Sequence, residues 1–372
     1  MKILFSSQIF QDQKFGGISR YYSEIYKGIL KNELIQIQLP LLYSENLYIK
    51  DVISNDLSFY KILIALNLFK KSIIRKIHRY DVKSLKVLLK KQQYDLFIPT
   101  YYDTDFIDYI GNKPFVLSVY DMIHEKFPHL FLNDLTTVRN KKLLIGSATK
   151  IIAVSHNTKK DIIEIYPEID ASKIIVVYHG SSLVVDQKYH SLPSNYILYV
   201  GSRFGYKNFG LLLKGCEKIL KSEQDLFLVC AGGGSFSTIE NNLIEDLKIT
   251  AKVKQINFDE NQLGFIYNNA KIFIFPSEYE GFGIPVLESM SCGCPVILSN
   301  SSSFPEVAEN AGLFFEYNNE KDLEDKILLL LKNETYRKEI IDLGYAQANK
   351  FSWETAVNQC IDVYKLAIES SE

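Results

Sequence analysis

Short runs of apolar, β-branched and aromatic residues alternate with helical patterns along this chain of 372 residues. Each run is almost continuously Val, Ile, Leu or Phe, which is typical of a parallel strand covered by helices on both faces. The runs predicted as strands are residues 3–6, 96–99, 115–119, 151–154, 174–178, 197–200, 227–231, 256–258, 272–275 and 295–298. They form two series, so the sequence predicts an α/β protein with two Rossmann-like domains.

The two series are separated by residues 184–194, a polar segment that contains a proline. A chain of this length also exceeds what one hydrophobic core usually supports, so two domains are expected. The first domain is predicted to span residues 1–185 and the second residues 195–351. A final helix is predicted over about residues 352–372.

Two carboxylates follow one of the later predicted strands. Glu280 lies on a glycine-rich turn, and Glu288 lies on the helix expected after it. Pro285 suits the first turn of that helix, because an N–H there would have no partner. Gly281 and Gly283 let backbone N–H groups approach a ligand closely, and the helix N-terminus adds a partial positive charge. Together these groups suit a polyhydroxylated, anionic ligand, and a nucleotide sugar is such a ligand.

A second motif lies within residues 196–209, where a buried strand is followed by Gly201 and then by a helix start. Arg203 and Lys207 flank this turn. Arginine offers a planar fork of donors and lysine a compact charge, and the two together suit a diphosphate. The alternative interpretation is a pair of solvated charges near a loop.

The spacing of Glu280, seven residues and Glu288 resembles the signature of the retaining glycosyltransferases of family four, which have the GT-B fold. The flanking residues that also resemble this family in order and spacing are 263–277, 293–297, 304–307 and 311–313. The resemblance implies transfer of a sugar from a nucleotide diphosphate sugar, with retention at the anomeric carbon. It also implies two Rossmann-like domains whose parallel sheets face a central cleft, with the last helix crossing back onto the first domain.

The resemblance also implies a role for each residue of these motifs. Glu280 would contact the hydroxyls of the donor sugar and the positive charge that builds on its ring. Arg203 and Lys207 would neutralise the departing diphosphate, without a metal ion or another cofactor. Glu288 would accept hydrogen bonds from the ribose hydroxyls. The donor-binding residues that the resemblance implies are Gly16, Gly17, Gly201, Phe282, Gly283, Ile284 and Glu288.

The N-terminal half carries looser matches to the family. Gly16 and Gly17 follow the first strand and resemble the family's glycine-rich loop beside the donor phosphates and the acceptor. His124 follows another strand, in a loop where family members often carry a His that faces the transferred sugar. The family commonly has an Asp next to that His, whereas Asp121 is separated from His124 by two residues. A surface histidine is the alternative interpretation.

Charge is distributed unevenly along the chain. The formal net charge is −2, yet residues 1–190 carry 26 Lys and Arg against 19 Asp and Glu. The excess is concentrated in residues 61–91, where ten Lys or Arg alternate with Ile and Leu and Asp81 is the only acid. Such a basic amphipathic stretch suits an anionic membrane surface, and a packed helix pair with a solvated basic face is the alternative. Nucleic acid is disfavoured as a partner, because the charge is local and no recognition motif accompanies it.

Five cysteines are scattered over predicted strands and helices. Cys292 and Cys294 lack the second pair that a zinc site would need. The sequence shows no signal peptide and no apolar run of membrane-spanning length. We therefore expect a cytoplasmic protein with free, buried thiols, peripheral on the inner face of the cell membrane if the basic segment binds lipid.

Residues 200–209 look most like the bacterial mannosyl- and rhamnosyl-type branch of the family, which builds surface polysaccharides such as O-antigen and capsule. GDP-mannose is the first expected donor and a UDP-hexose the second, and the acceptor is expected to be a glycan or a lipid-linked sugar. Three other functions stay open. A GT-B nucleotide-sugar epimerase would share the fold but lack the Glu pair and its Arg and Lys partners. A phosphorylase would need a pyridoxal-binding Lys and usually a far longer chain. The third is a non-catalytic scaffold that binds nucleotide sugars.

Overall fold

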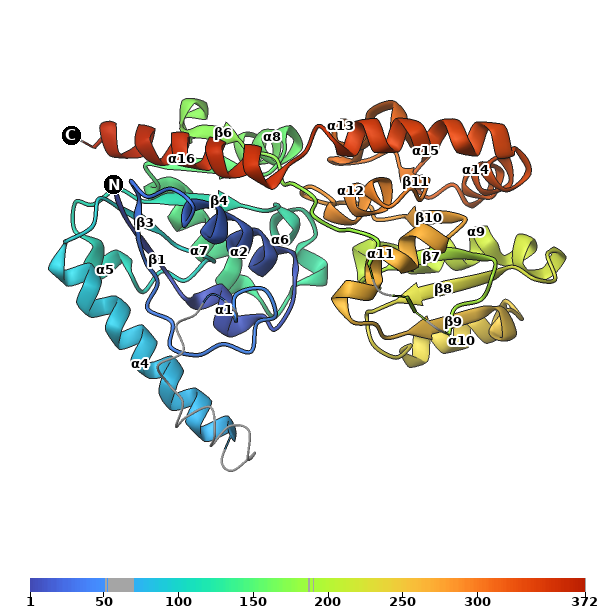
Figure 1. The fold of residues 1–372 in the computed structure, drawn as a ribbon, viewed down its shortest axis with the longest axis horizontal. Coiled ribbons are helices and arrows are strands. Elements are labelled where there is room, and N and C mark those ends of the chain that lie inside the picture. The colour runs from blue at the N-terminus through green and yellow to red at the C-terminus, as the bar shows by residue number, and fades with distance from the viewer. Residues whose placement is uncertain (51, 53–69, 187, 190, 372) are drawn as a thin grey trace. The chain divides into compact units, whose positions relative to one another are not determined.

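The computed structural model describes residues 1–50, 52, 70–186, 188–189 and 191–371. The chain forms two compact units, which are coloured by residue number in Figure 1. The first unit contains Met1–Val154, Thr158–Tyr178 and Trp353–Glu372. The second unit contains Ser155–Asn157 and His179–Ser352.

The described part of the first unit contains six parallel strands, namely β1 (Lys2–Phe5), β2 (Gln36–Gln38), β3 (Leu96–Ile98), β4 (Val116–Val119), β5 (Lys150–Ala153) and β6 (Ile174–Val176). They form two three-stranded sheets, β2-β1-β3 and β4-β5-β6, which a parallel bridge between Phe97 and Phe115 joins. The strand order reverses at β1 and β3, so the switch point of a doubly wound sheet lies between these two strands.

The helices of the first unit are α1 (Gln8–Asp12), α2 (Gly17–Ile29), α4 (Lys70–Lys91), α5 (Ile107–Ile110), α6 (Ile123–Lys126), α7 (Leu135–Ser147), α8 (His156–Ile165) and α16 (Trp353–Glu369). Although α16 ends the chain, it packs against α2 and against strands β3, β4 and β5. Cys360 and Tyr364 of this helix are fully buried. The end of the chain therefore completes the core of the unit in which the chain begins.

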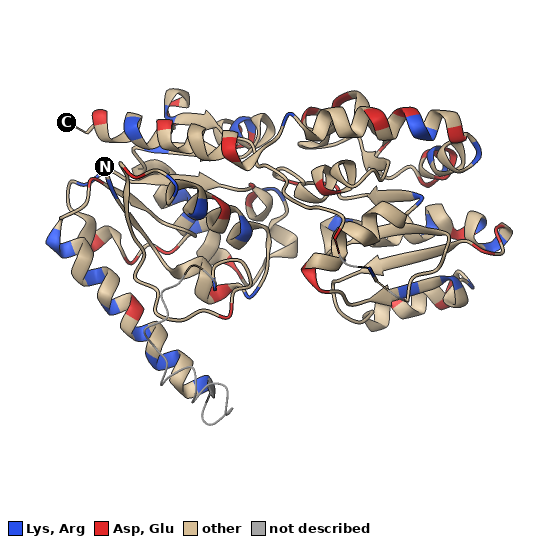
Figure 2. Ribbon diagram, in the orientation of Figure 1, with Lys and Arg blue, Asp and Glu red and all other residues tan. Residues whose placement is uncertain are grey.

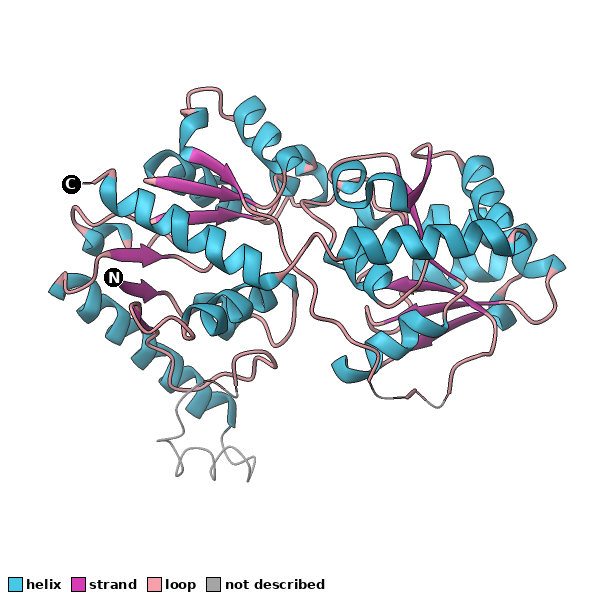
Figure 3. Cartoon of the chain, turned by 45° about the horizontal axis from the view of Figure 1, so that its top comes forward, coloured by secondary structure: helices cyan, strands magenta, loops and turns pink. Residues whose placement is uncertain are grey.

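The second unit is a single six-stranded parallel sheet in the order β12-β11-β10-β7-β8-β9. Its strands are β7 (Tyr196–Val200), β8 (Phe227–Ala231), β9 (Val253–Ile256), β10 (Ile272–Phe275), β11 (Val296–Ser299) and β12 (Gly312–Phe315). Its helices are α9 (Phe209–Ser222), α10 (Thr238–Asp246), α11 (Glu260–Asn269), α12 (Ile284–Ser291), α13 (Phe304–Ala308), α14 (Glu320–Lys332) and α15 (Glu334–Ala348). Figure 3 shows helices on both faces of this sheet.

Strand β7 illustrates why these strands are apolar along their whole length. Ile197 and Tyr199 belong to the core cluster that includes residues of α9 and α14. Tyr196 points to the other face, where its hydroxyl donates to the carbonyl of Ile266 on α11 at 2.6 Å. All five residues of the strand are buried, because helices cover both faces. The prediction of an α/β protein built on parallel sheets is thus confirmed.

The sequence missed two strands, and both lie at sheet edges. β2 has the sequence Gln-Ile-Gln and is partly exposed, so it lacks the apolar run used to recognise a strand. β12 spans Gly312–Phe315, and residues 311–313 were recognised only by their resemblance to the family, not as a strand. The predicted strand at residues 256–258 was also misplaced, because β9 spans Val253–Ile256 and contains the exposed Lys254. Among the helices of the described residues, none is long and apolar enough to cross a membrane.

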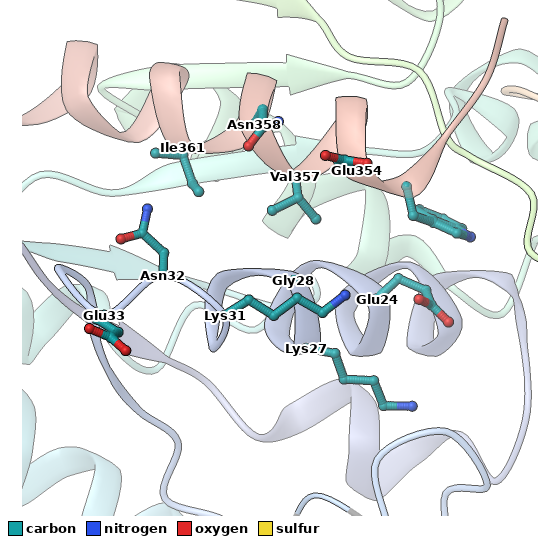
Figure 4. Close-up of a pocket in the computed structure, with 11 residues that line it drawn as sticks. Glu24, Lys27, Gly28, Lys31, Asn32, Glu33, Glu354, Val357, Asn358 and Ile361 are labelled. Atoms are coloured by element: carbon teal, nitrogen blue, oxygen red, sulfur yellow. The ribbon is translucent and has the colours of Figure 1, made fainter.

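A groove of about 670 Å³ runs between the C-terminal half of α2 and the N-terminal half of α16, as Figure 4 shows. None of the residues predicted for the functional site lines it. Within the groove the two helices approach closely at Gly28, where an added Cβ would lie 2.4 Å from Cγ2 of Val357. The absence of a side chain at Gly28 is therefore what allows α16 to dock.

We expect Gly28→Ala to destabilise the protein despite the better helix propensity of alanine. The steric overlap with Val357 should cost about 1–3 kcal/mol, against a gain of about 1 kcal/mol from propensity. Thermal unfolding measures the result. Gly146→Ala is the matched control, because nothing lies within 4 Å of a Cβ placed there on α7. A melting temperature of Gly28→Ala equal to that of Gly146→Ala would contradict this account, and Gly28→Ala with Val357→Ala should recover stability.

Candidate functional site

Two loops of the second unit meet at the carboxyl ends of β7 and β10. These strands are neighbours in the sheet although β8 and β9 separate them in sequence, so the switch point lies between them. The Glu278 N–H donates to the Tyr206 carbonyl oxygen at 2.8 Å, which ties one loop to the other. Lys207 forms an ion pair with Glu280, and each of these side chains is 14% exposed. The fold therefore brings together two residues that are 73 positions apart in the chain.

A run of serines after β11 holds the loop that carries Glu280. The Glu280 N–H donates to Oγ of Ser302 at 3.0 Å. The fully buried Ser303 hydroxyl lies 2.9 Å from the Glu280 carbonyl oxygen and 3.0 Å from that of Phe282. Sequence reasoning missed these two serines. The signal that could have found them is their place directly after a strand, where loops of a parallel sheet converge.

Helix α12 begins beside this loop, as predicted. Gly283 is its N-cap residue and has φ +92° and ψ +55°, a left-handed conformation that glycine adopts without strain. Pro285 lies in the first turn, so the predicted helix start is confirmed. Glu288 follows on the same helix and is 5% exposed, and the Tyr267 hydroxyl donates to its Oε2 at 3.5 Å. The N-terminus of α12 thus lies on the same glycine-rich turn as Glu280, whose carboxylate pairs with Lys207 from the other loop.

The Arg203 side chain is buried and forms several hydrogen bonds within the second unit, which the sequence did not predict. Its side chain is 3% exposed, and Nε donates to Glu240 at 2.7 Å. The remaining nitrogens donate to the carbonyl oxygens of the loop after β8, at residues Gly232, Gly233, Gly234 and Ser235. The guanidinium carbon also lies 4.8 Å from the centre of the Phe236 ring. Arg203 therefore anchors the glycine-rich loop beside β7, a role that the sequence analysis did not assign to it.

Phe282 is packed between two aromatic residues from distant parts of the chain. The His179 ring meets it edge-on with 4.9 Å between centroids, and Phe351 lies 5.9 Å away. Burial lowers the pKa of His179 to about 3, so this imidazole is neutral at physiological pH. Both contacts hold the Phe282 side chain beside the start of α12.

His124 lies in the first unit, on the short helix α6. Its ring packs against Phe131 with 4.2 Å between centroids and 39° between the ring planes, and Nε2 is 3.4 Å from Oδ2 of Asp134. Burial, followed by the charge of Lys141, lowers the pKa of His124. Nδ1 is buried and has no hydrogen-bond partner among the described residues. His124 is therefore a half-buried, neutral histidine rather than a solvated surface residue.

Gly16 and Gly17 lie at the N-terminus of α2, with Gly16 as the N-cap residue. The side-chain oxygen of Gln13 accepts a hydrogen bond from the Ser19 N–H at 3.2 Å, which satisfies one donor of the first turn. The same Gln13 oxygen would lie 2.6 Å from a Cβ at position 16, so a side chain there would disturb this cap.

The predicted residues thus fall into two groups. The second unit brings together Lys207, Glu280, Phe282, Gly283, Ile284 and Glu288, with Gly201 and Arg203 in the loop after β7. Gly16, Gly17 and His124 belong to the first unit. The described residues contain no group of three or more His, Cys, Asp or Glu side chains that could hold a metal ion. All five cysteines are free and buried, as expected.

Comparison with known families agrees with this arrangement. Residues 185–347 match the family described as glycosyl transferases group 1, and residues 59–183 match glycosyltransferase family 4. These two regions cover most of the chain. The fold is that of a GT-B protein, with the candidate site at the switch point of the second unit. The chain belongs to the family-four glycosyltransferases.

Among curated proteins, the chain is 30% identical over 236 residues to O-antigen chain mannosyltransferase B of Escherichia coli, covering 60% of this chain and 62% of that protein. It is 28% identical over 249 residues to O-antigen chain mannosyltransferase RfbU of Salmonella typhimurium, covering 66% of this chain and 67% of that protein. The match thus spans less than two thirds of the first of these relatives.

The fold is shared with solved structures at lower identity. The structure of Anabaena Alr3699/HepE in complex with UDP and glucose superposes with a TM-score of 0.70 at 16% identity, covering 98% of this chain and 100% of that chain. At that identity the likeness concerns the fold alone. It confirms the predicted GT-B class.

We expect Arg203→Lys to destabilise the second unit, because a lysine cannot reproduce the donor fork that spans Glu240 and four carbonyl groups. Charge-assisted hydrogen bonds contribute about 1.5–3 kcal/mol each, so a loss of this order is expected. Denaturant unfolding measures it. Arg337→Lys is the matched control, because Arg337 donates to the Leu330 carbonyl oxygen at 3.3 Å and its loss should cost less than about 0.5 kcal/mol. Equal midpoints for the two variants would refute the anchoring role.

Proposed function

We propose that this protein is a retaining glycosyltransferase that moves a hexose from a nucleotide diphosphate sugar to a glycan or lipid-linked acceptor. The observation that carries the proposal is the Lys207–Glu280 ion pair at the switch point of the second unit, beside the N-terminus of α12 and the buried Glu288. A cation, a carboxylate and a helix N-terminus in one place suit a ligand that is anionic at one end and hydroxylated at the other.

The chemistry follows from these charges. When the bond between the anomeric carbon and the diphosphate breaks, negative charge grows on the diphosphate and positive charge grows on the sugar ring. Lys207 would stabilise the first charge and Glu280 the second. In the structure these two side chains neutralise each other, so a bound diphosphate would share Lys207 with Glu280. We propose that no metal ion is required, because Lys207 and the N-terminus of α12 supply the positive potential.

Glu288 has a different proposed role. Its carboxylate is buried and lies beside the Tyr267 hydroxyl, so its position is fixed before a ligand arrives. A fixed carboxylate accepts hydrogen bonds from a pair of adjacent hydroxyl groups without losing side-chain entropy. We propose that it binds the ribose hydroxyls, as the family signature implies. His124 facing the transferred sugar remains a prediction.

GDP-mannose is the proposed donor. The support is that both curated relatives reported above are named as O-antigen chain mannosyltransferases, which also points to surface polysaccharide biosynthesis as the role. A UDP-hexose is the second candidate, supported by the Anabaena structure, which contains UDP and glucose.

Release of free nucleotide diphosphate from a panel of nucleotide sugars tests the function and the donor together. We expect Glu280→Gln to retain affinity for the free nucleotide diphosphate but to lose turnover by at least about tenfold, because it lacks the charge that stabilises the sugar ring. Glu288→Gln should weaken binding of donor and free nucleotide alike. The loss of one charge-assisted hydrogen bond, about 1.5–3 kcal/mol, corresponds to at least about tenfold.

The outcomes separate the competing functions. An epimerase would convert the sugar without passing it to an acceptor, and a scaffold would bind a nucleotide sugar without releasing nucleotide diphosphate. The anomeric configuration of the product, measured by NMR, decides between retention and inversion. Normal nucleotide affinity with lost turnover in Glu288→Gln would mean that the roles of the two glutamates are exchanged.

We also propose that the exposed face of α4 binds an anionic membrane surface and so brings the enzyme to a lipid-linked acceptor. Residues 61–69 of the basic segment lie outside the described residues, so the argument rests on α4 alone. Arg75, Lys76, Arg79 and Lys83 are exposed along this helix, and Figure 2 shows the basic residues in blue. Asp81 is buried, where it accepts hydrogen bonds from Gln11 and the Leu42 N–H. Asp81 is the one acidic residue of α4, and because it is buried the exposed face of the helix carries only basic charges.

Co-sedimentation with anionic vesicles tests this surface. Replacing Arg75, Lys76, Arg79 and Lys83 with Gln should lower vesicle binding by at least about tenfold, since each basic residue near such a surface contributes about 1 kcal/mol. Wild-type binding should also weaken with salt, because exposed charges are screened within about 8 Å at physiological ionic strength. The matched control removes four exposed cations of the second unit, at Lys214, Lys218, Lys221 and Lys248. If the wild-type protein does not sediment with anionic vesicles at low salt, the proposal that α4 binds a membrane surface is wrong.

A further inference from the structure

We propose that a cavity at the switch point of the first unit binds one uncharged sugar ring and is a subsite for the acceptor glycan. The cavity measures about 240 Å³ and lies at the carboxyl ends of β1 and β3. Ligands of doubly wound sheets bind at such a switch point. Helices α1 and α4 and the loop before α5 complete the walls, and Figure 1 labels these elements. That the sugar belongs to an acceptor rests on the proposed function.

The cavity contains a buried hydroxyl group that the protein itself does not use. Ser7 lines the cavity and is 2% exposed. It is the N-cap residue of α1, where a serine hydroxyl usually accepts a hydrogen bond from the first turn, yet its side chain makes no such bond. The neighbouring Ser6 hydroxyl is engaged with Thr100 at 3.0 Å, whereas that of Ser7 has no hydrogen-bond partner in the described part of the chain. A ligand hydroxyl in the cavity would satisfy it.

One wall of the cavity is apolar. Val82, Leu85 and Leu89 of α4 line it, and their spacing places them on one face of that helix. Phe97 and Phe106 add aromatic surface; both are buried, with 4.6 Å between their ring centroids. A sugar ring presents C–H groups as well as hydroxyls, so it suits a cavity that combines an apolar wall with a few polar groups.

The charged groups of the cavity are mostly carboxylates. Asp12, Asp103 and Asp105 line it, and among the described lining residues Lys86 is the one cation. Lys86 Nζ lies 3.2 Å from Oδ2 of Asp105, so that carboxylate already compensates it. The lining therefore has two more carboxylates than cations. Carboxylates accept hydrogen bonds from sugar hydroxyls but repel a phosphate group.

Hydrogen bonds join the walls of the cavity to one another. The side-chain oxygen of Gln8 accepts from the Asp103 N–H at 3.2 Å, which joins α1 to the loop after β3. The Gln11 side-chain amide donates to the buried Asp81 at 2.9 Å, which joins α1 to α4. Walls that are fixed before a ligand binds lose little entropy on binding.

Size and charge together decide which part of a substrate fits. Sites for drug-sized ligands measure about 300–1,000 Å³, so this cavity has room for one ring and not for a nucleotide diphosphate sugar. Its excess of carboxylates disfavours the phosphate groups of a lipid-linked acceptor. The cavity is thus suited to a sugar of the acceptor and not to its phosphate or lipid.

Saturation-transfer NMR with a panel of uncharged methyl glycosides, including methyl α-mannoside, tests binding. Val82 lines the cavity and is 40% exposed, so Val82→Trp fills the cavity from a position that tolerates a larger side chain. We expect it to weaken glycoside binding by at least about tenfold. Val87→Trp is the control and should bind as wild type does, because Val87 is on the same helix and 51% exposed but does not line the cavity.

A second pair of variants tests the hydroxyl group. Ser7→Ala should weaken glycoside binding by about threefold or more, through the loss of one neutral hydrogen bond. Ser23→Ala should leave it unchanged. The Ser23 hydroxyl on α2 is also buried without a partner among the described residues, but it does not line the cavity. Thermal unfolding should be similar for the two variants, since neither hydroxyl is bonded within the protein.

Mannose 6-phosphate tests the charge of the cavity. The binding compared is the part that Val82→Trp abolishes, and we expect the phosphate to weaken it by at least about tenfold relative to methyl α-mannoside. Asp103→Asn should reduce this preference for the uncharged sugar. Asp108→Asn should preserve it, because Asp108 is an exposed carboxylate on α5 that does not line the cavity.

Transfer assays connect the cavity to the reaction. With a neutral oligosaccharide acceptor, Val82→Trp should raise the acceptor KM by at least about tenfold and leave hydrolysis of the donor unchanged. An unchanged acceptor KM would refute the role as an acceptor subsite. Wild type that bound no glycoside of the panel, glycoside binding that persisted in Val82→Trp, or equal binding of mannose 6-phosphate would each overturn the proposal.

A failure of the proposed function gives a different result. Wild-type protein that released no nucleotide diphosphate from any nucleotide sugar would refute the transferase. The NMR comparison of Val82→Trp with Val87→Trp needs no turnover, so it would still decide whether the cavity binds a sugar.

Discussion

The pairing of β7 with β10 is the constraint on which the rest of the second unit depends. Both strands are buried on both faces, so neither can carry polar chemistry along its length. Polar residues are therefore confined to the loops at the strand ends, and the reversal of strand order at this pair leaves room for them to converge. Lys207 and Glu280 meet there because their strands are neighbours, not because their sequence positions are close.

The charged residues near this site mostly form hydrogen bonds or ion pairs with residues from other loops of the second unit. Arg203 is engaged with the loop after β8, Lys207 with Glu280, and the Glu280 backbone with Ser302 and Ser303. Such contacts orient donors and acceptors before a ligand binds, which reduces the entropy lost on binding. In the first unit the buried Lys141 likewise pairs with Glu125, in the segment that contains His124. Preorganisation by buried or half-buried charge pairs is thus a feature common to both units.

Sequence motifs predicted the local geometry of the turn and helix after β10, because these residues lie in one contiguous stretch. The left-handed Gly283, Pro285 in the first turn and Glu288 one turn further on each follow from backbone rules that a short segment obeys by itself. The role of Arg203 could not be predicted in the same way. Its partners at residues 232–235 and 240 are about thirty positions away, and only the pairing of β7 with β8 brings them close.

The amino-acid sequence by itself determined the α/β class, nine of the twelve named strands and the local shape of the loops after β7 and β10. These follow from apolar runs and from the conformational preferences of glycine and proline, which act over a few residues. Only the tertiary structure decided the partners of Arg203, the serine support of Glu280 and the burial of Lys141. The physical reason is that a charge or a hydroxyl has no preferred partner along the chain, and strand order and helix packing determine which group lies within reach.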